Sequence, residues 1–110
     1  MIVKRYRLSR KDFTACYKSA KIVASSLFVF KFKKNLLDYN RWSVVISKKI
    51  SKKATLRNKL KRRIYEILKK HTTNLKIDGI IYPRLMVLNL TYEKLGFEID
   101  SLLSKIPGFF

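Results

Sequence analysis

The sequence is poor in the residue types that build catalytic and metal sites. It has one cysteine and one histidine, Cys16 and His71, among 110 residues. A lone cysteine excludes an intramolecular disulfide, and a single Cys with a single His cannot form a Cys/His zinc cluster. We expect Cys16 to be a buried packing residue on the apolar face of a helix. We expect His71 either to cap a helix end or to lie exposed.

Glycine, proline and long apolar runs are also scarce. Three glycines and two prolines leave no Gly-rich phosphate loop of the P-loop or dinucleotide type. No apolar run approaches the ~18–20 residues that span a bilayer. The length suits a single domain over residues 1–110, and we expect a cytoplasmic protein that does not bind membranes.

Acidic residues are the scarcest charged type, with seven against 26 Lys and Arg and a net charge of +19. Residues 1–77 hold 23 of the basic residues and three of the acids. Between Lys48 and Arg63, nine of sixteen residues are basic and none is acidic. A solvated helix face usually interleaves opposite charges at four-residue spacing, whereas this segment repels itself. The pattern indicates an external polyanion as the partner.

Hydrophobic periodicity predicts an α+β fold. Ser9 and Asp12 resemble a capping pair that opens a helix over about 10–20. Residues 22–34 read as an extended segment, 41–47 as a strand, 54–70 as a helix and 78–82 as a strand. The last element is a C-terminal helix marked by Leu95, Ile99, Leu102, Leu103 and Ile106. The order α-β-β(-β)-α-β-α predicts a small sheet with helices packed on one side.

The helix expected over 54–70 carries one apolar stripe, which we assign to the core: Leu56, Leu60, Ile64, Ile67 and Leu68. In the C-terminal helix, Gly96 is a weak point that costs ~1 kcal/mol relative to alanine.

Aromatic residues occur in two groups. Phe13 and Tyr17 lie one turn apart on the first helix, and Phe28, Phe30 and Phe32 alternate along the extended segment. All five could be core residues. Alternatively, some could form a stacking floor for unpaired bases, where each stack contributes ~1–3 kcal/mol. The pattern leaves both interpretations open.

Several segments together resemble the protein component of bacterial ribonuclease P. The most specific are Ser47-Lys-Lys49 and, after a short basic loop, Leu56-Arg-Asn-Lys-Leu-Lys-Arg62. Arg7 to Tyr17, Arg41 at the start of a strand, Asp78 to Arg84 and Leu90 to Leu95 also fall where this family has counterparts. The resemblance therefore extends over the whole chain.

The resemblance implies a protein subunit of an endoribonuclease whose RNA subunit carries out Mg²⁺-dependent hydrolysis, mostly through RNA ligands. The holoenzyme would remove the 5′ leader of precursor tRNA, and no protein partner would be required. The implied contacts to the catalytic RNA are Lys48, Lys49, Lys52, Lys53, Arg57, Asn58, Lys59, Lys61 and Arg62. The implied cleft for the single-stranded leader contains Phe13 and Tyr17, with Phe28 and Phe30 as an extension of its floor. No protein ligand to a metal ion is assigned.

The resemblance also implies a left-handed β-α-β crossover, where the general rule for parallel strands would predict a right-handed one. Three positions depart from the family pattern. Lys59 stands in place of an arginine, Trp42 and Ser43 replace a Gly-containing strand start, and Lys31 lies near where some relatives have a cleft aromatic.

Two other functions fit the same charge. A structural RNA-binding protein, such as a small ribosomal protein, has no use for a single-strand cleft, so it would bury Phe13 and Tyr17 fully. A DNA-compacting protein would show no preference for structured RNA.

Overall fold

A computed structural model describes residues 4–71 and 76–105 of the chain. The elements in chain order are the 3-10 turn η1 (Lys4–Tyr6), α1 (Arg10–Ser19), β1 (Lys21–Ala24), β2 (Phe28–Lys34), β3 (Arg41–Val44), α2 (Ala54–Leu68), β4 (Ile77–Pro83), η2 (Leu85–Asn89) and α3 (Tyr92–Ser104). The predicted α+β class and element order are confirmed. Ile106, which we expected on the last helix, lies outside the described residues.

The strands form one four-stranded sheet in the order β1-β2-β4-β3. The extended segment 22–34 is a hairpin of two strands, because the Ser25 hydroxyl accepts hydrogen bonds from the backbone N–H groups of Leu27 and Phe28 and so closes a turn. β4 pairs antiparallel with β2 and parallel with β3. The chain between β3 and β4 runs through α2, as expected, and the left-handed sense of this crossover stays a prediction.

The main core lies between one face of the sheet and the helices α2 and α3. Phe28, Phe30 and Phe32 of β2 point into it, as do Trp42 and Val44 of β3. From α3, Leu95, Ile99, Leu102 and Leu103 close the same cluster. Gly79 lies where an added Cβ atom would come within 2.8 Å of the Phe30 and Trp42 rings, so the packing of these rings requires a glycine.

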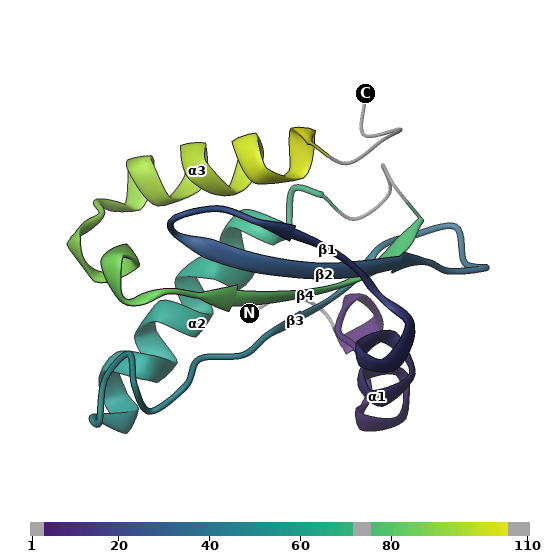
Figure 1. Ribbon diagram of the computed structural model, residues 1–110, viewed down its shortest axis with the longest axis horizontal. Coiled ribbons are helices and arrows are strands. Elements are labelled where there is room, and N and C mark those ends of the chain that lie inside the picture. Colours follow the sequence, from purple (N-terminus) through teal and green to yellow (C-terminus); the bar gives the residue numbers. More distant parts are fainter. Residues whose placement is uncertain (1–3, 72–75, 106–110) are drawn as a thin grey trace.

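α1 packs against the opposite face of the sheet, so the prediction that the helices share one side is wrong for this helix. Figure 1 shows α3 and α1 on opposite sides of the strands. Side chains alternate along a strand, and Lys31, which lies between the core residues Phe30 and Phe32, contacts Tyr17 of α1. Only Cys16 of α1 is fully buried, so this helix covers its face incompletely.

The buried Asn40 and the partly buried His71 connect the ends of several elements. Asn40 donates from its side chain to the carbonyl of His71, and its side-chain oxygen accepts from the N–H of Ile77. The Trp42 indole N–H also donates to the His71 carbonyl. The His71 ring contacts Asp100 of α3, with Nε2 and Oδ1 2.8 Å apart. His71 therefore joins α2, β3 and α3, which neither helix capping nor simple exposure predicted.

Candidate nucleic-acid interface

The outer side of α2 and the loop before it form a continuous cationic surface. One side of the helix is buried through Leu60, Ile64, Tyr65, Ile67 and Leu68. Leu56, which we expected in this stripe, is 47% exposed because it lies in the first turn, outside the main core cluster. The exposed residues of the helix and of the loop include Lys48, Lys49, Lys52, Lys53, Asn58, Lys59, Lys61 and Arg62. All eight were predicted as RNA contacts, and the structure brings them to one region.

The loop that carries four of these lysines has an ordered backbone. The Ser47 hydroxyl accepts from the N–H of Lys49, and the Ser51 hydroxyl accepts from the N–H of Lys53, both at 3.2 Å. Ile50 is buried and anchors the loop to the core. The guanidinium of Arg57 donates to the Ser51 carbonyl at 2.8 Å. Arg57 is half-buried, so this predicted RNA contact also fixes the loop against the first turn of α2.

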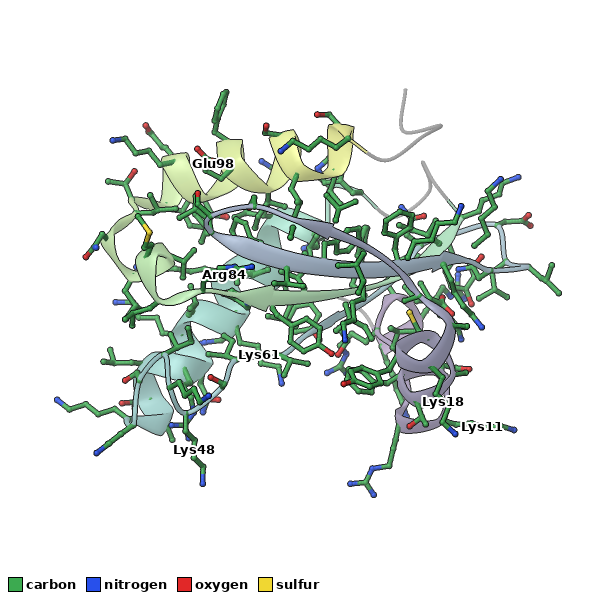
Figure 2. The ribbon with its side chains drawn as sticks, in the orientation of Figure 1. Lys11, Lys18, Lys48, Lys61, Arg84 and Glu98 are labelled. Carbon is green, nitrogen blue, oxygen red and sulfur yellow. The ribbon has the colours of Figure 1, made fainter. Side chains whose placement is uncertain are left out.

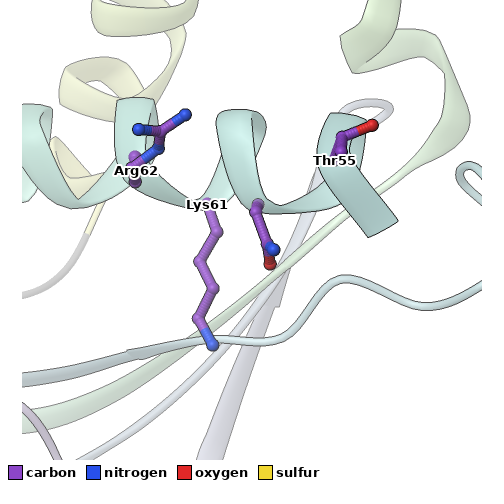
Figure 3. Close-up of a pocket in the computed structure, with 4 residues that line it drawn as sticks. Thr55, Lys61 and Arg62 are labelled. Carbon is purple, nitrogen blue, oxygen red and sulfur yellow. The ribbon is translucent and has the colours of Figure 1, made fainter. Parts of the chain in front are cut away.

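The N-terminus of α2 has no compensating negative charge. Its cap residue is Lys53, whose side chain makes no capping hydrogen bond, and the first turn has no acidic residue. The partial positive charge of the helix end therefore adds to that of the lysines. Thr55, Asn58, Lys61 and Arg62 line an open hollow of about 490 Å³ on this helix. Figure 3 shows Lys61 and Arg62 leaving α2 in different directions.

A second candidate surface lies between α1 and the open face of the sheet. Tyr17 is 53% exposed and Phe13 is partly exposed, and their rings are stacked with centroids 6.3 Å apart. The Lys31 ammonium lies 3.9 Å from the centre of the Tyr17 ring and 5.4 Å from that of Tyr82. The surface thus combines accessible aromatic rings with a cation.

Phe28 and Phe30 do not belong to this surface, and their assignment to the floor of the leader cleft is wrong. They are 1% and 0% exposed, because they face the core beneath α2 and α3. Lys31 and Tyr82 are among the residues that face α1 from the sheet, and the predicted leader cleft did not include them. Because side chains alternate along a strand, the sequence already indicated that Lys31 points to the face opposite the phenylalanines. It gave no such indication for Tyr82. The assignment failed because the wrong face was taken as the open one.

An ion cluster holds α1 against the sheet. Arg41 at the start of β3 donates to both carboxylate oxygens of Asp78, at 2.8 and 2.9 Å, and to Asp12 of α1 at 2.7 Å. Asn35 also donates to Asp78, which is almost completely buried. The hydrogen bond to Asp78 is the main cause that raises the pKa of Arg41 above its ordinary value. Asp12, Arg41 and Asp78 of the resemblance are therefore structural residues.

Cys16 is a buried residue of α1. The Cys16 thiol is buried against the Asp78 carbonyl, and burial is the main cause that raises its pKa to about 11. A thiol with so high a pKa is a poor nucleophile at neutral pH. Among residues 4–71 and 76–105, no three His, Cys, Asp or Glu side chains gather as a metal site. Within these ranges, no helix is both long and apolar enough to cross a bilayer.

The comparisons with known proteins agree over nearly the whole chain. The family model for ribonuclease P matches residues 3–107. The chain is 37% identical to the ribonuclease P protein component of Thermotoga petrophila, covering 96% of this chain and 93% of that protein. It is 35% identical to the corresponding protein of Legionella pneumophila, covering 81% and 87%.

Solved structures show the same fold. The ribonuclease P protein of Staphylococcus aureus superposes with a TM-score of 0.83 at 31% identity, covering 96% of this chain and 98% of that one. The protein from Thermotoga maritima gives a TM-score of 0.80 at 32% identity, covering 93% and 98%. The family match, the curated relatives and the structures together show that this chain belongs to the family of bacterial ribonuclease P protein components.

Proposed function

We propose that this chain is the subunit that binds both the catalytic RNA of ribonuclease P and the single-stranded 5′ leader of precursor tRNA. In this role it assists the Mg²⁺-dependent endonucleolytic step that produces the mature 5′ end of tRNA. The RNA subunit carries the chemistry. The membership of the family supports the ribonucleoprotein context, and the two surfaces described above support the division of labour.

The cationic surface of α2 is suited to folded RNA. Phosphates bind where several cations and unpaired backbone N–H groups converge, and the first turn of α2 offers both. Lys59 provides charge without the bidentate geometry of an arginine, so it positions RNA less strictly than Arg57 or Arg62. RNA bound here supplies the negative charge that the helix lacks.

The cleft beside α1 is suited to an unpaired strand. Exposed rings accept bases of any sequence by stacking, and Lys31 lies beside them to pair with a phosphate. The observation that carries the proposal is the exposure of Tyr17 and Phe13. A structural RNA-binding protein of the ribosomal kind would bury both rings, so the accessible cleft favours the leader-binding function.

In the holoenzyme, Mg²⁺ is bound mainly by RNA ligands. The carboxylates nearest to this surface, Asp12 and Asp78, are already engaged in ion pairs with Arg41. The protein contributes by drawing the phosphates of leader and catalytic RNA together, which lowers the Mg²⁺ concentration needed for assembly.

The test is cleavage of precursor tRNA by a bacterial ribonuclease P RNA at low Mg²⁺, with and without this protein. We expect the protein to restore cleavage at the correct 5′ site. Arg62→Ala removes one phosphate contact and should weaken RNA assembly about tenfold, with a salt dependence that is less steep by about one unit. Tyr17→Ala should leave assembly unchanged and weaken precursor binding about tenfold, because one stack is lost.

Two matched controls lie on α3 and do not belong to the residues of either surface. Lys94→Ala also removes one exposed cation, and Tyr92→Ala also removes one exposed ring. Both should behave like the wild type. Tight RNA binding without restored cleavage, in the presence of a well-matched RNA, would leave only a structural RNA-binding protein.

A further inference from the structure

A second cationic hollow lies at the β3 edge of the sheet and shares only Lys61 with the surfaces predicted from the sequence. Its volume is about 350 Å³, and its polar lining is Lys4, Arg7, Ser9, Ser43, Lys61 and Tyr65. These residues come from the N-terminal segment, β3 and α2. Figure 2 shows Lys61 leaving α2 on the side that faces α1.

The walls of this hollow are fixed by backbone hydrogen bonds. Arg7 forms a β-bridge with Trp42, and the N–H of Leu8 donates to the Trp42 carbonyl at 2.9 Å. Ser9 is held as the N-cap of α1. The Tyr65 hydroxyl accepts from the N–H of Val44 at 3.2 Å, which leaves its own proton for another acceptor. These hydrogen bonds hold the segments that line the hollow in fixed positions.

The Ser9 hydroxyl donates to the Asp12 carboxylate, but the cations of the hollow have no anionic partner among the described residues. No carboxylate lines it, and within the described part of the chain Lys4, Arg7 and Lys61 have no ion pair. The Nε of Arg7 is buried and has no hydrogen-bond acceptor. An oxyanion at the guanidinium would give Arg7 the acceptor that the protein does not provide.

The hollow lies close to the surface beside α1 that we propose for the leader. Ser43 lies beside Ile80, and Ile80 lies beside Lys31 on the neighbouring strand, so the three form a row across the open face of the sheet. Two strand spacings place Ser43 about 10 Å from Lys31. Lys61 lines both this hollow and the one on α2. A strand that passes from Tyr17 toward the α2 loop therefore crosses the β3 edge.

We propose that this hollow binds one backbone phosphate of the single-stranded leader, held by Arg7, Lys4 and Lys61 with the hydroxyls of Ser43 and Tyr65. Duplex RNA presents its phosphates on a wide, stiff surface, whereas an unpaired strand can turn one phosphate into a narrow hollow. The inference rests on the proposed function.

The test compares Arg7→Gln and Lys4→Gln with the wild type in holoenzyme reconstituted with a bacterial ribonuclease P RNA. We expect each variant to weaken binding of a long-leader precursor about 3- to 10-fold and to reduce the salt slope by about 0.7, the value for one single-strand phosphate. Affinity for the ribonuclease P RNA and for mature tRNA should stay within twofold. The difference should vanish for a precursor whose leader is cut to one nucleotide.

The controls keep the outcomes distinct. Lys94→Gln removes an equivalent charge on α3 and should have no effect. Lys4 is exposed in a 3-10 turn, so Lys4→Gln is informative even if thermal unfolding shows that Arg7→Gln destabilises the fold. An unchanged precursor affinity and salt slope in Lys4→Gln, or a loss that falls equally on the catalytic RNA, would overturn the inference. Failure of the wild type itself to assemble with the RNA would instead overturn the proposed function.

Discussion

At the scale of single residues, the two glycines within described elements have opposite roles. Gly79 lies beneath two aromatic rings, whereas a Cβ atom on Gly96 of α3 would meet only the Ile67 side chain, at 4.0 Å. Packing therefore requires glycine at position 79 in β4, whereas Gly96 only lowers the helix propensity of α3.

We predict that Gly96→Ala raises the free energy of unfolding by ~0.5–1 kcal/mol, because alanine restricts the unfolded chain and favours helix. Gly79→Ala should lower it by ~1–3 kcal/mol, because the methyl group overpacks the core. Chemical denaturation of both variants measures these changes. Equal effects of the two substitutions would contradict the packing described here.

Arg41 is the residue on which the position of α1 depends. It is the shared partner of Asp12 on the helix and of the buried Asp78 on β4. Removal of the guanidinium leaves Asp78 buried without its counter-charge.

We predict that Arg41→Ala lowers the free energy of unfolding by ~3–5 kcal/mol, the usual cost of breaking a buried ion pair. Arg10→Ala, which removes an exposed arginine at the start of α1, should change it by no more than ~0.5 kcal/mol. Urea denaturation provides the measurement. A loss below ~1 kcal/mol for Arg41→Ala would mean that Asp78 is stabilised mainly by Asn35 and the backbone.

At the scale of elements, α2 carries like charges that lower its own stability. Lys59 and Arg63 are four residues apart, and both line a hollow beside Leu56 and Leu88. Like charges at this spacing repel, so the helix is held by its buried side against the sheet and α3.

We predict that Lys59→Glu raises the free energy of unfolding by ~0.3–0.8 kcal/mol, because it replaces a repulsion by a Glu-to-Arg attraction in the favourable order. The same change should weaken binding to ribonuclease P RNA by at least tenfold. Lys59→Gln separates loss of charge from reversal and should lie between the two. If Lys59→Glu destabilises the free protein, repulsion between the cations of α2 does not limit the stability of this helix.

At the scale of the whole molecule, the charge is strongly asymmetric. Residues 1–77 carry all of the excess positive charge, and the acids of α3 lie on the other side of the sheet from α1. Repulsion among these charges therefore destabilises the free protein, and RNA or salt can reduce this repulsion.

We predict that the thermal midpoint of the free protein rises by several degrees between low salt and about 0.2 M chloride, where the Debye length falls below ~8 Å. Sulfate at the same ionic strength should raise it further, because anions bind where the cations converge. Arg62→Gln should reduce that additional rise, and Lys94→Gln should not. A flat response to both salts would show that the charge does not destabilise the fold.

The sequence alone determined the properties that are carried by local pattern and by charge. The capping pair at Ser9 and Asp12, the buried side of α2 and the cationic surface around Arg62 follow from residue spacing, because helix geometry places such residues whatever lies around them. The resemblance carried by Ser47 to Arg62 identified the family.

Only the tertiary structure decided which face of the sheet is open. Alternation along β2 separates Phe30 from Lys31, but it does not say which of the two faces α2 and α3 will cover. That choice depends on long-range contacts, above all the Arg41 cluster that holds α1 on the opposite face. It buried Phe28 and Phe30, left Tyr17 accessible, and placed Arg7, Ser43 and Lys61 around one hollow although they are far apart in the sequence.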